Sequence, residues 1–146
     1  MLVKDILNQQ KRKIITAGEK TTIKQAMKLM VDNKISCLPV LEDDGKLVGI
    51  ISDKDIFWKI YETECHIREM TVGEVMTSNL IVGVPEDEVP YIAGVMTENK
   101  IRHVPIIQQD RMIGLVSVGD IVKTQMENIK IENRYLQQYI SGSYPG

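Results

Sequence analysis

The chain has 146 residues, of which 43% are hydrophobic and 26% charged, and its formal net charge is -2. This length and composition are typical of a soluble protein with one sizeable core. The small net charge gives no bulk attraction to nucleic acid. No apolar run approaches the ~20 residues that cross a bilayer, and the first thirteen residues lack the apolar region of a signal peptide. We therefore expect a cytoplasmic protein that binds neither nucleic acid nor membrane.

The first half of the chain predicts a strand, a helix, a strand pair and a second helix. The strand is expected over Lys13–Thr16, which is mostly aliphatic. The helix begins after Thr22 as N-cap and carries one apolar face, formed by Ile23, Ala26, Met27, Met30 and Val31. The strand pair turns at Asp44-Gly45, a strong hairpin signal. The next helix is expected to start at Ser52.

The second half predicts the same elements in the same order. Residues 62–70 interrupt the apolar periodicity and mark the boundary. A strand is expected over Leu80–Gly83, and a helix follows with apolar positions at Val89, Ile92, Ala93 and Met96. Pro90 fits the first helical turn, which needs no internal amide donor. The last helix is expected to start at Ser117 and to run through 125–140, before the final Ser-Gly-Ser-Tyr-Pro-Gly ends it.

These matching elements form a tandem repeat. The stretch "MVDNKISCLPV" (30–40) aligns with "MTENKIRHVPI" (96–106), and "GIISDKDI" (49–56) aligns with "GLVSVGDI" (114–121). Nine of 26 aligned positions are identical, whereas roughly one or two are expected by chance. Earlier, "VKDIL" (3–7) resembles "VGEVM" (72–76), with three extra residues in the loop that follows the first copy. We therefore divide the chain into repeats at 1–66 and 67–128, with a helical tail at 129–146.

Each repeat carries one Ser-x-x-Asp pair at a helix start: Ser52 with Asp55, and Ser117 with Asp120. Free backbone amides and the helix dipole favour an anion at such a place. An aspartate one turn later can accept hydrogen bonds from two ribose hydroxyls, as acidic residues do in dinucleotide sites. The alternative is that each pair is only a capping box, with aspartate in place of the usual glutamate.

At this point the sequence resembles the CBS-domain pair, also called a Bateman module. The resemblance rests on "NKISCLPV…GKLVGIISDKDI" and "VMTSNLIV…NKIRHVPI…RMIGLVSVGDI" and covers residues 1 to about 128. It implies an α+β fold of two β-α-β-β-α repeats, with small mixed sheets packed about a pseudo-twofold axis. It also implies a regulatory module, similar to small stand-alone bacterial members of the family. Such a module binds AMP, ADP, ATP, S-adenosylmethionine or NAD(H), uses no catalytic cofactor and signals to a protein partner.

The resemblance also implies two ligand clefts, each joining one repeat's Ser-x-x-Asp to strands of the other repeat. We name them by their aspartates. The Asp55 cleft is expected to contain Ser52, Asp55, Thr77, Leu80, Val82 and Ile101. The Asp120 cleft is expected to contain Ser117, Gly119, Asp120, Asn8, Ile14, Thr16 and Ile35. The family's Met-Thr pair is present at 76–77 but is replaced by Leu-Asn at 7–8.

Three further features have two interpretations each. Arg102 could hold a phosphate with its planar fork, or it could be a solvent-facing strand residue. His103 could contact the ligand or could be packed and hydrogen-bonded. The basic run at 11–13 could reach a phosphate or could form a solvated face.

Signals for other functions are weak. Cys65 and His66 have no second cluster to complete a metal site, and Cys37 and Cys65 are expected to be free thiols. Phosphate-loop motifs and nucleophile–base pairs are absent from the sequence, so no catalytic residue is expected. The alternatives to a ligand-binding regulatory module are an interaction module that has lost its ligand and a nucleotide-processing enzyme.

A homodimer is expected, because the helices of each repeat leave apolar faces to cover and twofold dimers are the commonest solution. The last helix adds Met126, Ile129, Tyr135, Leu136, Tyr139 and Ile140.

Overall fold

The computed structural model describes residues 1–64 and 66–140, except for the side chains of 128–133, 135 and 138–140 in the last helix. The expected free thiol of Cys65 and the expected helix end within 141–146 therefore lie outside the described residues. So do the side chains of Ile129, Tyr135, Tyr139 and Ile140 in the expected dimer face. In the part that is described, no helix is both long and apolar enough to cross a membrane.

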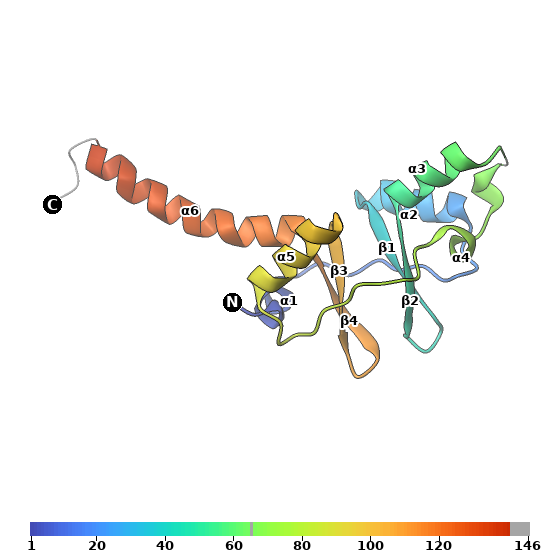
Figure 1. Ribbon diagram of the computed structural model, residues 1–146, viewed down its shortest axis with the longest axis horizontal. Helices are drawn as coiled ribbons and strands as arrows, with labels where there is room; N and C mark the ends of the chain where they lie inside the picture. Colours follow the sequence, from blue (N-terminus) through green and yellow to red (C-terminus); the bar gives the residue numbers. More distant parts are fainter. Residues whose placement is uncertain (65, 141–146) are drawn as a thin grey trace.

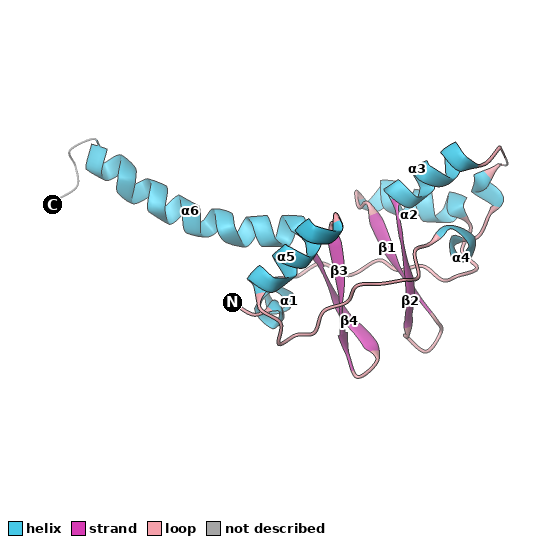
Figure 2. Ribbon diagram, in the orientation of Figure 1, coloured by secondary structure: helices cyan, strands magenta, loops and turns pink. Residues whose placement is uncertain are grey.

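The fold is α+β, as the sequence predicts, with two antiparallel hairpins and a long final helix that extends away from the rest (Figures 1 and 2). The elements in chain order are α1 (Val3–Gln9), α2 (Ile23–Asn33), β1 (Cys37–Leu41), β2 (Leu47–Ser52), α3 (Asp53–Glu62), the 3-10 turn η1 (Ile67–Glu69), α4 (Val72–Val75), α5 (Val89–Asn99), β3 (His103–Gln108), β4 (Arg111–Ser117) and α6 (Val118–Ile140).

Both predicted strand pairs are confirmed. In the first hairpin β1 pairs with β2, and Gly45 in the turn has a φ of 89°, a conformation that glycine adopts without steric cost. In the second hairpin β3 pairs with β4. Each ladder has an irregularity at the equivalent place, after Val40 in the first and after Ile106 in the second. The hairpin tips contact each other, because the Arg111 guanidinium donates to the Asp44 carbonyl.

The first predicted strand of each repeat is wrong as a regular strand. Instead of strands over Lys13–Thr16 and Leu80–Gly83, the chain makes one isolated parallel bridge per repeat, Ala17 with Val40 and Gly83 with Ile106. In the first bridge, Ala17 N donates to Pro39 O and Leu41 N donates to Ala17 O, both at 2.9 Å. The two hairpin strands pair with each other in the antiparallel direction. Each sheet is therefore mixed only through this one parallel bridge.

The repeated Asn-Lys of the sequence ends α2 and α5 in the same way. Asn33 and Asn99 each donate a side-chain amide to the carbonyl four residues earlier, at 2.8 and 2.9 Å. Lys34 and Lys100 then take the left-handed conformation, with φ of 54° and 55°. A residue in this conformation commonly ends a helix, and Asn and Gly are its usual occupants.

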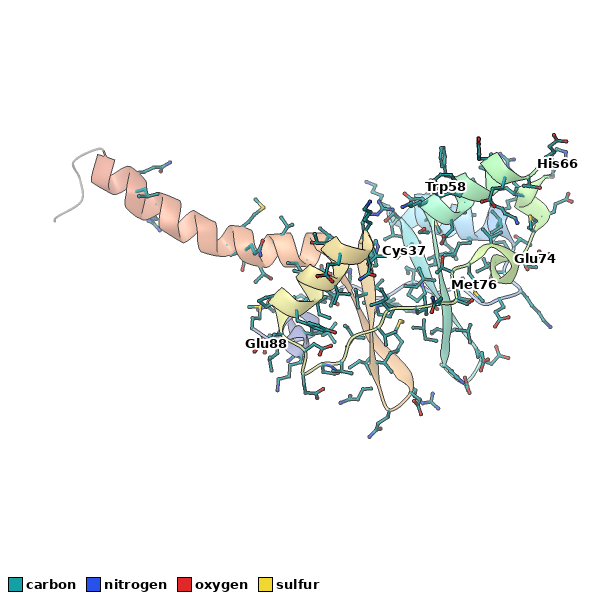
Figure 3. The ribbon with its side chains drawn as sticks, in the orientation of Figure 1. Cys37, Trp58, His66, Glu74, Met76 and Glu88 are labelled. Carbon is teal, nitrogen blue, oxygen red and sulfur yellow. The ribbon has the colours of Figure 1, made fainter. Side chains whose placement is uncertain are left out.

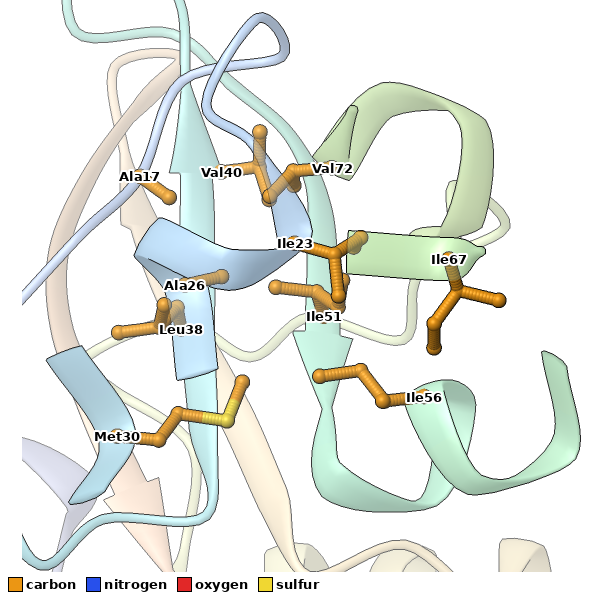
Figure 4. Close-up of a cluster of buried hydrophobic side chains, with 10 residues drawn as sticks. All are labelled: Ala17, Ile23, Ala26, Met30, Leu38, Val40, Ile51, Ile56, Ile67 and Val72. Atoms are coloured by element: carbon orange, nitrogen blue, oxygen red, sulfur yellow. The ribbon is translucent and has the colours of Figure 1, made fainter. Parts of the chain in front are cut away.

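The hydrophobic side chains form two clusters, one in each half of the molecule. Figure 4 shows the first, which joins α2, β1, β2 and α3 to Ile67 of η1 and Val72 of α4. The second joins α5, β3, β4 and α6 to Val3 and Ile6 of α1. The helix that begins the first repeat thus packs on the second half, and α4 packs on the first. Since each cluster uses residues of both repeats, neither repeat completes its core alone.

The three extra residues of the first repeat lie in a helix and not in a loop, which corrects the sequence interpretation. α1 extends over Val3–Gln9, whereas α4 ends at Val75. The reason is that Thr77 forms an antiparallel bridge with Ile50, with N–O distances of 2.8 and 2.9 Å, and this pairing draws the chain out of the helix.

The close approach of Met76 to β2 predicts that Gly49 cannot be replaced without cost (Figure 3). A Cβ on Gly49 would lie 2.5 Å from Met76 Sδ and 3.0 Å from the backbone oxygen of Thr77. We expect Gly49→Ala to lower the free energy of unfolding by about 1–3 kcal/mol, measured by chemical denaturation.

The matched control is Gly94→Ala in α5, where a Cβ would meet nothing within 4 Å. Alanine is the better helix former, so this variant should be more stable by about 0.5–1 kcal/mol. Equal stability of the two variants would contradict the packing of Met76 on Gly49.

Candidate functional site

Both Ser-x-x-Asp pairs form capping boxes at strand-to-helix junctions. Ser52 is the last residue of β2, and its side chain accepts a hydrogen bond from Asp55 N at 3.1 Å. In return Ser52 N donates to Asp55 Oδ2 at 2.9 Å. Ser117 and Asp120 make the same two bonds, at 3.1 and 2.8 Å. The capping interpretation is therefore correct for both pairs, and it leaves open what the rest of each carboxylate can bind.

The Asp55 cleft is a cavity of about 430 Å³ with walls from both repeats. Asp55 lies on one wall, where its Oδ1 accepts the Thr77 hydroxyl at 3.0 Å. Trp58 lies one helical turn after Asp55 on α3 (Figure 3). It lines the same cavity and is half-exposed. Lys54, Lys100 and Arg102 supply cationic groups. The cavity thus offers an acceptor, an aromatic face and several positive charges.

The structure brings together most of the residues that were expected in this cleft. Of these residues, Ser52, Asp55, Thr77, Leu80 and Ile101 line the cavity. Arg102 and His103, which were assigned to neither cleft, line it as well. Val82 is not among them: its side chain is 47% exposed, and Ile81 lines the cavity in its place. Without the predicted strand over Leu80–Gly83, strict alternation of side chains does not apply there. Trp58 was missed, although its spacing of three residues from Asp55 puts both on one helix face.

Arg102 and His103 stand where the two halves meet. Arg102 forms an ion pair with Asp53 at 2.6 Å between two half-exposed side chains. His103 and Cys37, at equivalent positions in β3 and β1, line both the Asp55 cavity and a cavity on the other side. Burial, followed by the nearby Arg102 charge, lowers the pKa of His103, so the imidazole is neutral at neutral pH. Burial raises the pKa of the Cys37 thiol to about 12.

The Asp120 carboxylate differs sharply from that of Asp55. Arg12 makes two parallel hydrogen bonds to it, from NH1 to Oδ1 at 3.0 Å and from NH2 to Oδ2 at 2.8 Å. The Gln10 side chain donates to Oδ2 at 3.0 Å and also to the Leu115 carbonyl. Burial acts to raise the pKa of Asp120, but the hydrogen bonds from Arg12 and Ser117 outweigh it and hold this pKa below the ordinary 3.8.

Two cavities of about 600 Å³ each lie beside Arg12. Ser117 lines one cavity, Asp120 lines the other, and Arg12 lines both. Of the residues expected here, Ile14 and Ile35 line the cavity that contains Ser117.

Asn8, Thr16 and Gly119 line neither cavity of the Asp120 cleft. Asn8 is exposed within α1, because the extra residues lengthen that helix. Gln10 and Arg12 approach Asp120 from the chain beyond the helix. In the sequence, the one sign of this approach was the basic run at 11–13, which contains Arg12.

Comparisons with known proteins identify the family. The family model described as the CBS domain matches residues 3–62 and 72–127. Among curated proteins, the mitochondrial CBS domain-containing protein CBSX3 of Arabidopsis thaliana is 35% identical over 127 residues. That match includes 84% of this chain and 62% of the relative, so the chain spans less than two thirds of this relative's length.

Solved structures share the fold over most of the chain. The CBS-domain containing protein ATU1752 from Agrobacterium tumefaciens superposes with a TM-score of 0.81 at 27% identity, covering 86% of this chain and 99% of that one. The CBS domain pair of MJ0100, solved in complex with 5'-methylthioadenosine and S-adenosyl-L-methionine, gives 0.76 at 32% identity, with 88% and 98% covered. With both repeats matched and the paired arrangement shared, this chain belongs to the CBS-domain family.

Proposed function

We propose that this chain is a non-catalytic regulatory module that binds an adenosine-containing ligand between its two repeats. One observation carries the proposal: the Asp55 carboxylate opens onto a cavity that also contains Trp58. The cavity of about 430 Å³ lies within the size range of small-molecule sites. Support also comes from the solved complex of the MJ0100 pair with two adenosine derivatives.

The chemistry of the Asp55 cleft suits each part of such a ligand. A carboxylate accepts about four hydrogen bonds, and the described residues supply two, from Ser52 N and the Thr77 hydroxyl. Two acceptor positions are left for the two hydroxyls of a ribose. The half-exposed indole of Trp58 can stack on a base. Lys54, Lys100 and Arg102 favour a negatively charged group such as phosphate.

A regulatory role completes the proposal. The ligand would touch α3 and β2 of one half and the start of β3 of the other, so binding would favour one relative arrangement of the halves. The regulated protein partner and the cytoplasmic location remain predictions.

The first prediction is binding without turnover. We expect calorimetry to detect binding of at least one of AMP, ADP, ATP, NADH, S-adenosylmethionine and 5'-methylthioadenosine. Chromatography of the same mixtures should return each compound unchanged. Product formation that follows the pure protein through every purification step would contradict the non-catalytic part.

The second prediction separates ligand binding by Asp55 from its capping role. Glutamate is the usual partner in a capping box, so Asp55→Glu should keep the free energy of unfolding within about 0.5 kcal/mol of wild type. Its carboxylate moves by one methylene, so ligand affinity should fall about 10- to 100-fold, as it should in Asp55→Ala.

The control for that experiment is Gln25→Ala, which removes the equivalent partner from the capping box of α2, away from both clefts. It should lower stability slightly and leave affinity unchanged. Unchanged affinity in both Asp55 variants would mean that this aspartate only caps α3.

We also propose a homodimer, because both halves expose apolar helix faces. On α2 and α3 the exposed fractions are 74% for Val31, 67% for Phe57 and 54% for Ile60, beside an apolar groove of about 380 Å³. On α5 and α6 the exposed apolar residues, among the side chains that are described, include Tyr91, Val118, Val122, Met126 and Leu136. The two faces belong to equivalent helices of the two repeats, so a second copy could cover both.

The third prediction is the mass in solution. Sedimentation should give twice the 16.6 kDa of one chain at micromolar concentration. Phe57→Lys should shift the mass to one chain, since an unpaired charge would be buried in the interface. Ile113→Lys makes the same kind of change at an exposed residue of β4, away from these helices, and should leave the dimer intact. A wild-type monomer at all concentrations would contradict the dimer.

A further inference from the structure

The Asp120 carboxylate is fully occupied by groups of this chain. Its Oδ2 accepts Ser117 N at 2.8 Å, Gln10 Nε2 at 3.0 Å and Arg12 NH2 at 2.8 Å, and its Oδ1 accepts Arg12 NH1 at 3.0 Å. The four bonds equal the about four acceptor positions of a carboxylate, with three donors on Oδ2 and one on Oδ1. Two ribose hydroxyls could bind Asp120 together only after one of these donors leaves.

Arg12 is the donor that can leave. The Ser117 amide is fixed in the capping box, and Gln10 is held additionally by the Leu115 carbonyl at 3.1 Å. The Arg12 side chain is 51% exposed, whereas that of Asp120 is 13% exposed. Removal of the guanidinium would free one acceptor position on each oxygen. It would also enlarge both cavities, because Arg12 lines each of them.

A guanidinium that leaves a carboxylate needs another anion. An uncharged nucleoside offers none, so its binding would replace a paired arginine by an unpaired one. A phosphate offers two oxygens in the planar, bidentate geometry that arginine prefers. Lys11, Lys13, Lys34 and Lys123 line the same two cavities and add to the attraction for phosphate.

We infer that Arg12 is a specificity latch on the Asp120 cleft, which opens to adenosine compounds that carry a phosphate and excludes those that do not. In this exchange the Arg12 guanidinium binds the phosphate, and the ribose hydroxyls donate hydrogen bonds to the acceptor positions of Asp120 that Arg12 has left. The inference rests on the proposed function. The Asp55 cleft has no such latch: its only cleft arginine, Arg102, pairs with Asp53 and not with Asp55 among the described residues.

The test measures the Asp120 cleft alone, in the full-length chain with Asp55→Ala. Calorimetric titrations with AMP, ATP and adenosine are repeated after Arg12→Gln is added. We expect the Asp55→Ala chain to prefer AMP or ATP over adenosine by about tenfold or more. With Arg12→Gln, phosphate compounds should bind more weakly and adenosine more tightly, so that the preference falls to about threefold or less.

The gain in adenosine affinity is the decisive result. Loss of a positive charge alone would lower the affinity for AMP but would not raise the affinity for adenosine. Arg68→Gln is the control, because it removes the same charge from an exposed arginine of η1 that lines neither cleft. This variant should keep the preference of the parent chain.

Other outcomes would overturn the latch. Three results for Arg12→Gln would do so: an unchanged preference, equally weaker binding of all three compounds, or adenosine binding that is no tighter. A fourth is an Asp55→Ala chain that binds none of the compounds although wild type binds. In each case the proposed function would stand, because binding in the Asp55 cleft is measured separately with Asp120→Ala. If neither the wild type nor any variant bound an adenosine compound, the proposed function itself would fail.

Discussion

The hydrogen bond from a strand's last backbone amide to an aspartate in the first turn of the next helix sets the geometry of both clefts. Ser52 N donates to Asp55, and Ser117 N donates to Asp120. Because each serine ends a β-strand, the carboxylate is fixed at the strand-to-helix junction and lies near the positive end of the helix dipole. One oxygen of each carboxylate therefore stabilises the fold, while the other accepts a side chain from elsewhere in the chain, Thr77 for Asp55 and Arg12 for Asp120. The capping role is therefore compatible with the proposed ligand-binding role in the same residue.

The second constraint is the exchange of short helices between the halves. α1 completes the apolar cluster of the second half, and α4 completes that of the first. The chain must therefore pass twice between the halves, once before α2 and once after α4. These two crossings carry Ile14 past the Asp120 cleft and Leu80 past the Asp55 cleft. The same exchange that buries both cores thus supplies each cleft with a wall.

The repeated pattern predicted the fold well, because hairpin turns, helix caps and apolar spacing are local signals that the structure confirms. The first strands failed for a physical reason: an aliphatic run satisfies the strand pattern, but a strand also needs backbone partners. In the described part of the chain, parallel pairing with the hairpins is limited to Ala17, just after the first run, and Gly83, at the end of the second.

The residues of the Asp55 cleft were implied by the family resemblance, and most of them do line it. The resemblance could not predict the neighbours of Asp120. Arg12 and Asp120 are 108 residues apart in the chain, and their pairing depends on the length of α1.

That length accounts for the inequivalence of two clefts built from one repeated motif. After α4 the chain leaves the helix at once, and Thr77 presents a neutral hydroxyl to Asp55. After α1 the longer helix delays the exit, so that Gln10 and then Arg12 reach Asp120. A hydroxyl uses one acceptor position and leaves the carboxylate its charge, whereas a bidentate guanidinium uses two and neutralises it. Three extra residues in a helix therefore change the electrostatics of a cleft without changing the motif that forms it.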